Sequence, residues 1–313
     1  MRRFDFPARR RRALGGAAAS VAPLVLVAAR LQAQQVPGRD LFEFPLGTMG
    51  EAPALAEQSG VAFWNPALAA MPRGSRARFG VAALATPADQ GVSAQLAGVA
   101  VAFSKAVTGG LSVARAGVQD LVRTETDPQS LGRLSYNSTV YSALVARRSP
   151  AHVVTGLALR YRTGQLDDLR RGAVGLDGGV LADGLLGKLD ARVAVASFLW
   201  RPANRADERA TVTAATDARV RGTGELREAR AGYGFTVTQG GSREHYAVGS
   251  ARYGAWAGRL GVARATTFDD VTWRLRLGIG VYYARYVVGV SRESSGAAGL
   301  PATYQFSLSS TIK

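Results

Sequence analysis

The sequence predicts an all-β fold, a transmembrane antiparallel β-barrel of about 14 strands with a short, partly helical N-terminal plug. Three observations support this prediction. They are an export-type N-terminus, alternating strands that succeed one another from residue 76 onward, and glycines and arginines that share one face of those strands. A strand of about ten alternating residues is long enough to cross a bilayer in a tilted barrel.

The alternation is clearest in residues 271–290. In the first half of this stretch one face is apolar, from Val271 to Val281, and the other carries Arg274, Arg276 and two glycines. A helix would place both arginines among the leucines, so the period is two. The run reverses near residues 283–285, where tyrosines cluster. This hairpin alone fits a soluble sandwich as well as a membrane barrel, so the rest of the chain must decide.

Composition excludes several classes of protein. The chain has 313 residues, a net charge of +16 and no cysteine, which rules out disulfides, cysteine-ligated zinc and thiol catalysis. The charge would suit a nucleic-acid-binding protein. However, residues 1–33 hold seven arginines and one aspartate, which leaves 16 − 6 = +10 for the remainder, and the other arginines form no basic run. We therefore expect no nucleic-acid partner.

Residues 1–33 are typical of a secretory signal peptide. A basic start with four consecutive arginines precedes an apolar run, residues 13–29, and a small-residue site ends at Ala33. Pro23 and the shortness of the run argue against an uncleaved anchor helix. We expect export by the general secretory route to the outer membrane of a Gram-negative type of envelope. The predicted parts are thus a signal peptide (1–33), a plug segment (34–74) and a barrel (75–313).

Residues 34–74 differ from the rest of the chain. Asn65 suits a helix N-cap and Pro66 suits the first helical position, so we expect a short helix from Pro66 to Met71. Phe63 and Trp64 would pack beside the start of this helix and anchor it inside the barrel wall. Locally, a capped turn on any fold would look the same.

This segment resembles the N-terminal signature of the PorV/PorQ-type outer-membrane β-barrel family, which is related to the FadL-type transporters of hydrophobic compounds. The matching plug motif comprises Met49, Gly50, Phe63, Trp64, Asn65, Pro66 and Ala67. Glu51 and Leu68 depart from the family pattern, which usually has glycine at both places. A second similarity, to a Gly-hydrophobic-Asp strand at mid-barrel, lies at residues 175–181.

The resemblance leaves two function classes open. Similarity to FadL implies a barrel that passes or binds hydrophobic or amphipathic compounds by way of a plugged lumen. Similarity to PorV implies a non-transporting barrel that serves as a secretion-system or surface-attachment component. The partners would be outer-membrane lipid, with hydrophobic small molecules in the first case and secretion-system proteins in the second. A plain porin and a soluble exported β-protein are the further alternatives.

From residue 76 the chain reads as strands separated by turns. The predicted strands are 76–86, 91–104, 110–123, 132–146, 151–162, 171–182, 187–200, 208–220, 225–238, 243–255, 257–266, 270–283, 285–292 and 302–312. The turn signals are Pro87 with the three residues after it, Gly109-Gly110, Asp127-Pro128, Ser149-Pro150, Asp183-Gly184 and Gly240-Gly241. Residues 163–170 and 201–207 would form longer loops on one rim.

The strand faces predict which side chains enter the lumen. A charge that faces lipid at the midplane costs roughly 2–4 kcal/mol, so charges and glycines belong inside. The expected lumen-facing residues are Arg160, Arg162, Arg192, Glu228, Arg230, Arg274 and Arg276. The arginines in this set would pair with Glu228, Asp190 or plug carbonyls. Leu157, Leu159 and Leu199 would face lipid. Small lumen residues would leave room for about one folded segment.

The sequence contains no recognisable catalytic constellation. The two histidines, His152 and His245, stand alone near strand starts, and no base is placed beside a serine. Asp167-Asp168 and Asp269-Asp270 are turn pairs of the kind that solvent usually covers. The glycine-rich strands are not followed by the helix that a phosphate loop requires. We therefore expect no enzyme, no cofactor and no metal site.

Overall fold

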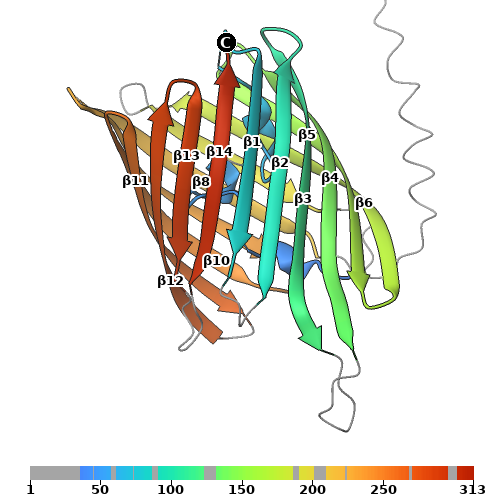
Figure 1. Cartoon of the computed structure of the whole chain (residues 1–313). Coiled ribbons are helices and arrows are strands. Elements are labelled where there is room, and N and C mark those ends of the chain that lie inside the picture. Colours follow the sequence, from blue (N-terminus) through green and yellow to red (C-terminus); the bar gives the residue numbers. More distant parts are fainter. Residues whose placement is uncertain are drawn as a thin grey trace, which may run out of the picture. The chain divides into compact units, whose positions relative to one another are not determined.

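The computed structural model shows a closed barrel of 14 antiparallel strands, in which each strand pairs with its neighbours in the chain and β1 closes on β14 (Figure 1). The structure describes residues 36–44, 46–57, 61–72, 74–86, 91–122, 132–185, 190–200, 209–222, 224–267, 270–294 and 302–313. The expected signal peptide lies outside these residues.

The predicted strand count is confirmed in the described part of the chain. The strands are β1 (Ala77–Ala85), β2 (Val92–Ala102), β3 (Val107–Val122), β4 (Arg133–Arg148), β5 (Val153–Leu166), β6 (Leu169–Leu185), β7 (Ala191–Phe198), β8 (Thr211–Arg221), β9 (Leu226–Thr238), β10 (Arg243–Tyr253), β11 (Trp256–Thr267), β12 (Asp270–Tyr283), β13 (Tyr286–Glu293) and β14 (Thr303–Ile312). Three short 3-10 helices precede them, η1 (Asp40–Phe42), η2 (Pro53–Leu55) and η3 (Pro66–Ala69). No helix among the described residues has the length and apolar character needed to cross a membrane.

The two ends of the barrel differ in the length of their connections. At one end, here called the short-turn end, the connections are residues 103–106, 149–152, 186–190, 222–225, 254–255 and 284–285. The opposite, long-connection end carries the longest connections, residues 123–132, 199–210 and 294–302, together with the shorter ones 86–91, 167–168, 239–242 and 268–269. Bacterial outer-membrane barrels show this asymmetry, with short turns on the periplasmic side and longer loops outside.

Two of the predicted turns are wrong. Gly109 and Gly110 lie inside β3, and the turn falls at residues 103–106. Gly110 is in the strand because neighbouring backbone comes close there: a β-carbon on it would lie 2.6 Å from Val99 O. Asp183-Gly184 belongs to β6, at a shift of register between Ala182 and Leu185. A glycine thus marks either a turn or a close approach within a strand.

The prediction of a longer loop at residues 163–170 is also wrong. Strands β5 and β6 extend to a tight turn at Asp167-Asp168. Asp167 takes a positive φ of 53°, which aspartate tolerates better than most residues. The turns expected at Ser149-Pro150 and Gly240-Gly241 are confirmed. Residues 87–90, 127–128 and 201–207 lie outside the described part of the chain.

The outer face of the barrel is apolar. On β12, Leu275, Leu277 and Ile279 are exposed, while Arg276 between them is only 3% exposed. The same pattern places Leu157, Leu159, Val193, Val195, Tyr233, Leu260, Val262, Val288 and Val290 on the surface. Trp273 and Tyr283 stand ten residues apart (283 − 273) on this face, which spans about 25 Å in a tilted strand. That length matches the hydrocarbon band of a bilayer.

The interior of the barrel holds the core. Two clusters of buried apolar side chains join residues 41–69 to inward-facing residues of the strands. Leu199, which the sequence assigned to the lipid face, belongs to one of these clusters and is 4% exposed. The reason is that β7 ends at Phe198 and Leu199 adopts a positive φ of 57°, which turns the chain inward.

Candidate functional site

The candidate site is formed by residues 36–72, here called the N-terminal segment, together with the inward-facing side chains of the strands. Both belong to one compact unit, Gln34–Lys313. In this unit η3 contacts β4, β5 and β6, η2 contacts β7 and β8, and η1 contacts β3. Figure 1 shows these blue elements within the ring of strands. The segment therefore touches the inner face of the wall from β3 to β8.

Glycines in β5 and β6 make a seat for η3. Asn65 caps this helix by accepting a hydrogen bond from Ala67 N (3.0 Å), and its amide donates to Ala54 O (2.9 Å). A β-carbon on Gly179 would lie 2.0 Å from Asn65 Oδ1, and one on Gly156 would lie 2.3 Å from Ala67 N. Only glycine lets the segment come so close to the wall.

A buried ion pair fixes the chain beside this seat. Arg160 pairs with Asp177, and both side chains are at most 1% exposed. The guanidinium of Arg160 also donates to Phe63 O (2.5 Å) and Ser142 Oγ (3.1 Å). Asp177 accepts from the backbone of Leu199 (3.0 Å) and Trp200 (2.9 Å). A charge this deeply buried is stable only because it is paired and hydrogen-bonded.

Aromatic rings surround the same arginine. Phe42, Phe63, Trp64 and Phe198 pack with ring centroids 4.6 to 6.3 Å apart. Arg160 lies 5.2 Å from the ring centre of Phe63 and 4.7 Å from that of Phe198. Trp64 satisfies its indole N–H by donating to Leu46 O (2.7 Å). The cluster holds the N-terminal segment to β5 and β7 by apolar packing and cation–π contact.

The first residues of the segment are fixed in a similar way. Arg162 donates to Val36 O (3.1 Å) and Pro37 O (2.9 Å). A β-carbon on Gly164 would lie 1.9 Å from Pro37 O, so glycine again permits the approach. Tyr136 also hydrogen-bonds Asp40.

Polar contacts also join the segment to other strands. Glu51 forms an ion pair with Arg259 of β11 (2.8 Å), and Glu57 forms one with Arg192 of β7. The amide of Gly47 donates to Gln305 Oε1 of β14 (3.1 Å). Arg78 of β1 donates to Glu57 O (3.1 Å) and to Leu68 O (2.9 Å). The segment is thus bound to both sides of the barrel interior.

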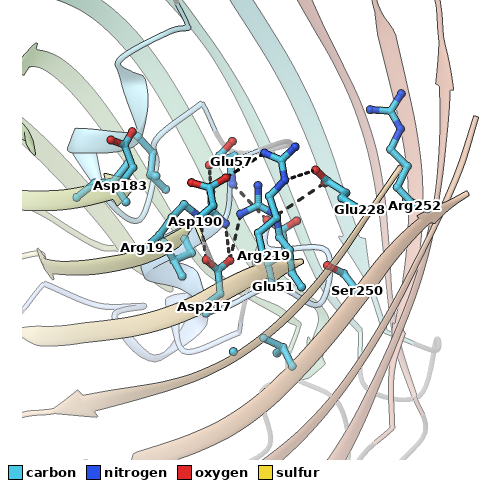
Figure 2. Close-up of a pocket in the computed structure, with 18 of the residues that line it drawn as sticks. Glu51, Glu57, Asp183, Asp190, Arg192, Asp217, Arg219, Glu228, Ser250 and Arg252 are labelled. Atoms are coloured by element: carbon cyan, nitrogen blue, oxygen red, sulfur yellow. Dashed lines mark hydrogen bonds and ion pairs between the residues drawn. The ribbon is translucent and has the colours of Figure 1, made fainter. Parts of the chain in front are cut away.

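Charged side chains surround a cavity of about 870 Å³ between the segment and the short-turn end of the barrel. Arg192, Asp217, Arg230, Glu228, Arg219 and Asp190 form a continuous chain of ion pairs along its wall (Figure 2). Residues of the segment that line the cavity are Gly50, Glu51, Ala52, Leu55, Glu57, Leu68, Ala70 and Pro72. His152, Arg252 and Thr311 line it as well. The cavity therefore presents both signs of charge to its contents.

A second group of charges lies on β10, β12 and β13. Arg276 pairs with Glu293 (2.5 Å) and Glu244 (2.6 Å), and Arg274 pairs with Glu293 (3.0 Å) and Glu244 (3.5 Å). Arg276 is 3% exposed, and its guanidinium lies 5.5 Å from the ring centre of Tyr246. Each arginine therefore has two carboxylate partners.

The residues singled out in the sequence come together only in part. The plug-motif residues Met49, Phe63, Trp64, Asn65, Pro66 and Ala67 are buried, and so is Gly50, whose φ of 85° favours glycine. Arg160 and Arg162 contact the segment directly, and Arg192 contacts it through Glu57. Arg230 and Glu228 belong to the chain of ion pairs, whereas Arg274 and Arg276 pair within the barrel wall.

Several residues of the site were missed in the sequence. They are the wall glycines Gly156 and Gly164, then Arg78 and Arg259, and the segment carboxylates Glu51 and Glu57, while Gly179 was noted only as part of the similarity at residues 175–181. One signal could have found the first group. Gly156 and Gly164 share strand parity with Arg160 and Arg162, and a glycine inside a strand indicates a close backbone approach.

The described residues contain no group of three His, Asp or Glu side chains that could hold a metal ion. His152 lies in a turn with a positive φ of 61°, 3.6 Å from Asp183. His245 is exposed on β10, where its Nδ1 lies 2.5 Å from the hydroxyl of Tyr233.

No protein-family model and no curated protein matches this chain. Among solved structures, it is similar to the low-pH structure of Pseudomonas putida OprB, with 7% identity, a TM-score of 0.40, and coverage of 76% of this chain and 92% of that one. It is similar to a bacterial polysaccharide outer membrane secretin, with 12% identity, a TM-score of 0.45, and coverage of 77% and 100%. It is also similar to CdiB from Acinetobacter baumannii, with 11% identity, a TM-score of 0.47, and coverage of 76% and 60%. The PorV/PorQ and FadL resemblance stays a prediction.

Proposed function

We propose that this protein is a transport barrel of the outer membrane whose lumen is closed by its own N-terminal segment. The observation that supports the membrane location is the inverted distribution of side chains, with apolar residues outside and ion pairs inside. A soluble barrel would expose charges and bury leucines. A closed barrel leaves no unpaired strand edge, which is what a strand protein needs in lipid.

The role of residues 36–72 as a plug is supported by contacts in opposite directions. Ala67 packs on Gly156 of β5, while Gly47 bonds to Gln305 of β14 and Glu51 pairs with Arg259 of β11. A segment tied to strands that far apart in the barrel order crosses the lumen. A compound that passes through the barrel must therefore displace it.

The class of compound follows from the cavity. The resemblance to FadL implies hydrophobic or amphipathic compounds. Because the cavity of about 870 Å³ is lined by arginines and carboxylates, it suits a charged or zwitterionic group, which favours the amphipathic class. Apolar residues of the inner wall, among them Leu84, Leu96 and Phe198, stay in place when the segment moves and would hold the non-polar part.

The second candidate function is a non-transporting barrel that serves as a secretion-system or surface-attachment component. The observation that favours it is the way in which the segment is held. A buried ion pair, an aromatic cluster and three glycine contacts fix it to β5, β6 and β7. If the segment stays in the lumen permanently, the barrel is a scaffold, and its two ends are the surfaces that bind partner proteins.

Cell fractionation tests the membrane location. The protein should sediment with the outer membrane, resist extraction by mild detergent and migrate differently on gels before and after heating, as folded barrels do. Recovery as a soluble monomer from the periplasm would overturn the proposal. The choice between the transporter and the scaffold depends on whether removing the segment opens a conducting path.

A further inference from the structure

The cavity at the short-turn end has more arginines than carboxylates in its described lining. Every lining carboxylate forms an ion pair with an arginine, and these carboxylates are Glu51, Glu57, Asp183, Asp190, Asp217 and Glu228. The lining arginines that take part are Arg148, Arg192, Arg219, Arg230 and Arg259. Arg78 and Arg252 also line the cavity, and neither has a described carboxylate at ion-pair distance. The described lining therefore carries positive charge that no carboxylate balances.

The two arginines differ in what they contact. Arg78 is 8% exposed, and its two terminal nitrogens donate to Glu57 O (3.1 Å) and Leu68 O (2.9 Å). Its donors are thus used by the N-terminal segment. Arg252 is half-exposed on β10, close to the turn at residues 254–255. Figure 2 shows Arg252 apart from the chain of ion pairs. Of the two, Arg252 is therefore the arginine that can meet a ligand.

Two contacts hold Arg252 in place and leave most of its donors unused. Its Nε–H donates to Gly254 O (3.3 Å), and its guanidinium carbon lies 3.8 Å from the ring centre of Tyr282 on β12. A guanidinium has five N–H donors, so the two terminal nitrogens keep four that have no described protein partner. Contact with an aromatic ring restricts the guanidinium, and a group that is already restricted loses less entropy when it binds a ligand.

The carboxylates near Arg252 do not pair with it. Glu228 is its cross-strand neighbour on β9, but the carboxylate of Glu228 pairs with Arg219 (3.1 Å) and Arg230 (3.7 Å). Glu225 lies beside Gly254, where a β-carbon would be 3.2 Å from Glu225 Oε2, and it forms no described ion pair with Arg252. The short stretches of sequence outside the described part on this side of the strands, residues 73, 186–189 and 223, contain no Asp or Glu. An anion inside the cavity would supply the partner that Arg252 lacks.

Apolar residues lie deeper in the cavity than Arg252. Val248 stands on the same inward-facing side of β10, four residues farther from the turn at 254–255. It packs against the buried cluster that includes Leu55 and Leu68 of the N-terminal segment, and all three residues line the cavity. A compound with its anionic group at Arg252 would therefore direct its non-polar part toward the segment.

We propose that Arg252 binds the anionic group, a phosphate or a carboxylate, of a compound that enters the cavity from the short-turn end. In bacterial outer-membrane barrels this end is the periplasmic side. Tyr282 is a positioning residue that holds the guanidinium in the cavity, and Val248, Leu55 and Leu68 contact the non-polar part of the compound. The inference rests on the proposed function: it makes the compound anionic and locates its binding site on the periplasmic side of the segment.

The test measures the affinity of the full chain in a neutral detergent by ligand-observed NMR titration. The probes are hexyl phosphate and hexanoate, with hexanol and hexyltrimethylammonium as the neutral and cationic counterparts. We expect one or both anions to bind more tightly than hexanol and the cation, and the tighter of the two identifies the preferred anionic group. Arg252→Gln should weaken anion binding by roughly tenfold, as the loss of a charge-assisted contact implies.

Further variants separate the charge from its positioning. Arg252→Lys should retain part of the affinity, because it keeps the charge but not the planar, two-pronged geometry. Tyr282→Phe keeps the ring and should bind like the parent, whereas Tyr282→Leu should bind anions several times more weakly. Arg227→Gln is the matched control, because it removes an exposed arginine of β9 that faces outward near the same end. Each variant must first show heat-modifiable migration.

Equal anion binding by the parent and Arg252→Gln would overturn the proposal, and so would hexanol that binds as tightly as hexyl phosphate. Inorganic phosphate that binds as tightly as hexyl phosphate would identify a site for free anions instead. Failure of the proposed function looks different. Recovery of a soluble periplasmic monomer, or a barrel that conducts no better without residues 36–72, would remove transport, whereas a barrel that inserts and opens normally but does not prefer anions would remove this inference alone.

Discussion

Gly179 of β6 lies directly against the side chain of Asn65, so closely that a β-carbon on the glycine would fall 2.0 Å from Asn65 Oδ1. Asn65 belongs to the first stretch that the sequence marks as a family resemblance, and Gly179 belongs to the second, residues 175–181. The two stretches are therefore the two sides of one contact. In the same stretch, Asp177 pairs with Arg160, which donates to Phe63 O.

Gly179→Ala should loosen the N-terminal segment. The added methyl group must push Asn65 away, which costs about 1–3 kcal/mol by overpacking and about 1 kcal/mol more if the helix cap is lost. We expect residues 61–72 to become accessible to a protease while the barrel keeps its heat-modifiable migration. The matched control is Gly178→Ala, because nothing lies within 4 Å of a β-carbon at that position. Equal protease resistance of the two variants would contradict the contact.

The pair of Arg160 and Asp177 should be costly to break from one side only. Asp177→Asn leaves the Arg160 charge buried without its counter-ion, and such changes typically destabilise by about 3–5 kcal/mol. We expect a lower unfolding temperature, measured as the temperature at which gel migration changes. Arg160→Met combined with Asp177→Asn removes both charges and should recover much of the loss. If the double variant is no more stable than Asp177→Asn alone, the unpaired charge of Arg160 is not the cause of the lower unfolding temperature.

Cysteine labelling should distinguish the two faces of β13. Val290 is 42% exposed and Ser291 is 4% exposed, although they are neighbours in the chain. In the membrane, a lipid-soluble maleimide should label Val290→Cys quickly and Ser291→Cys slowly. Both substitutions are close in size to the parent residues, so the fold should survive. If Ser291→Cys reacted faster from the bilayer, the assignment of faces would be reversed, and with it the lumen-facing set that includes Arg276.

Strands and faces could be predicted from the sequence because both are local. Alternation in residues 271–290 sets the face of each side chain without knowledge of its partners. The turns predicted at Gly109 and Asp183 were wrong because a glycine can also lie inside a strand where another part of the backbone comes close. Such a close contact depends on residues distant in the chain. The prediction that Leu199 faces lipid was wrong because β7 ends at Phe198, and the backbone N–H groups of Leu199 and Trp200 donate to Asp177 instead of continuing the strand. The partners of the segment, such as Gln305 and Arg259, were beyond prediction because no local pattern records which strands the segment faces.

Ionic strength should affect two parts of the segment, residues 50–57 and residues 63–69, differently. Glu51 and Glu57 are partly exposed in the charged cavity, so salt should weaken their pairs with Arg259 and Arg192. The aromatic cluster at Phe63 and Trp64 is apolar and should be indifferent to salt. We expect hydrogen exchange at residues 50–57 to quicken with added salt while residues 63–69 stay protected. Glu57→Gln should reproduce the effect at low salt, and an unchanged exchange rate in that variant would show that the pair does not hold the segment.

Deleting residues 36–72 should raise the ion conductance of the barrel in planar bilayers. The segment contacts Arg160 of β5, Arg259 of β11 and Gln305 of β14, so in the proposed function it crosses the lumen, and the backbone pairing of the strands does not include it. Asn65→Ala and Trp64→Ala should give a smaller increase, because each removes one anchor and leaves the others. The loss of the Asn65 cap costs about 1 kcal/mol, which loosens η3 without unfolding the barrel.

The parent protein and the Gly178→Ala variant are the controls for this measurement, since both keep the segment in place. The deleted barrel must first pass the heat-modifiability test, so that a failure to fold is not mistaken for a closed lumen. If it folds and conducts no better than the parent, residues 36–72 do not close the path. The transport proposal would then have no segment that opens and closes the lumen. The scaffold function would better explain a barrel whose interior holds many paired charges.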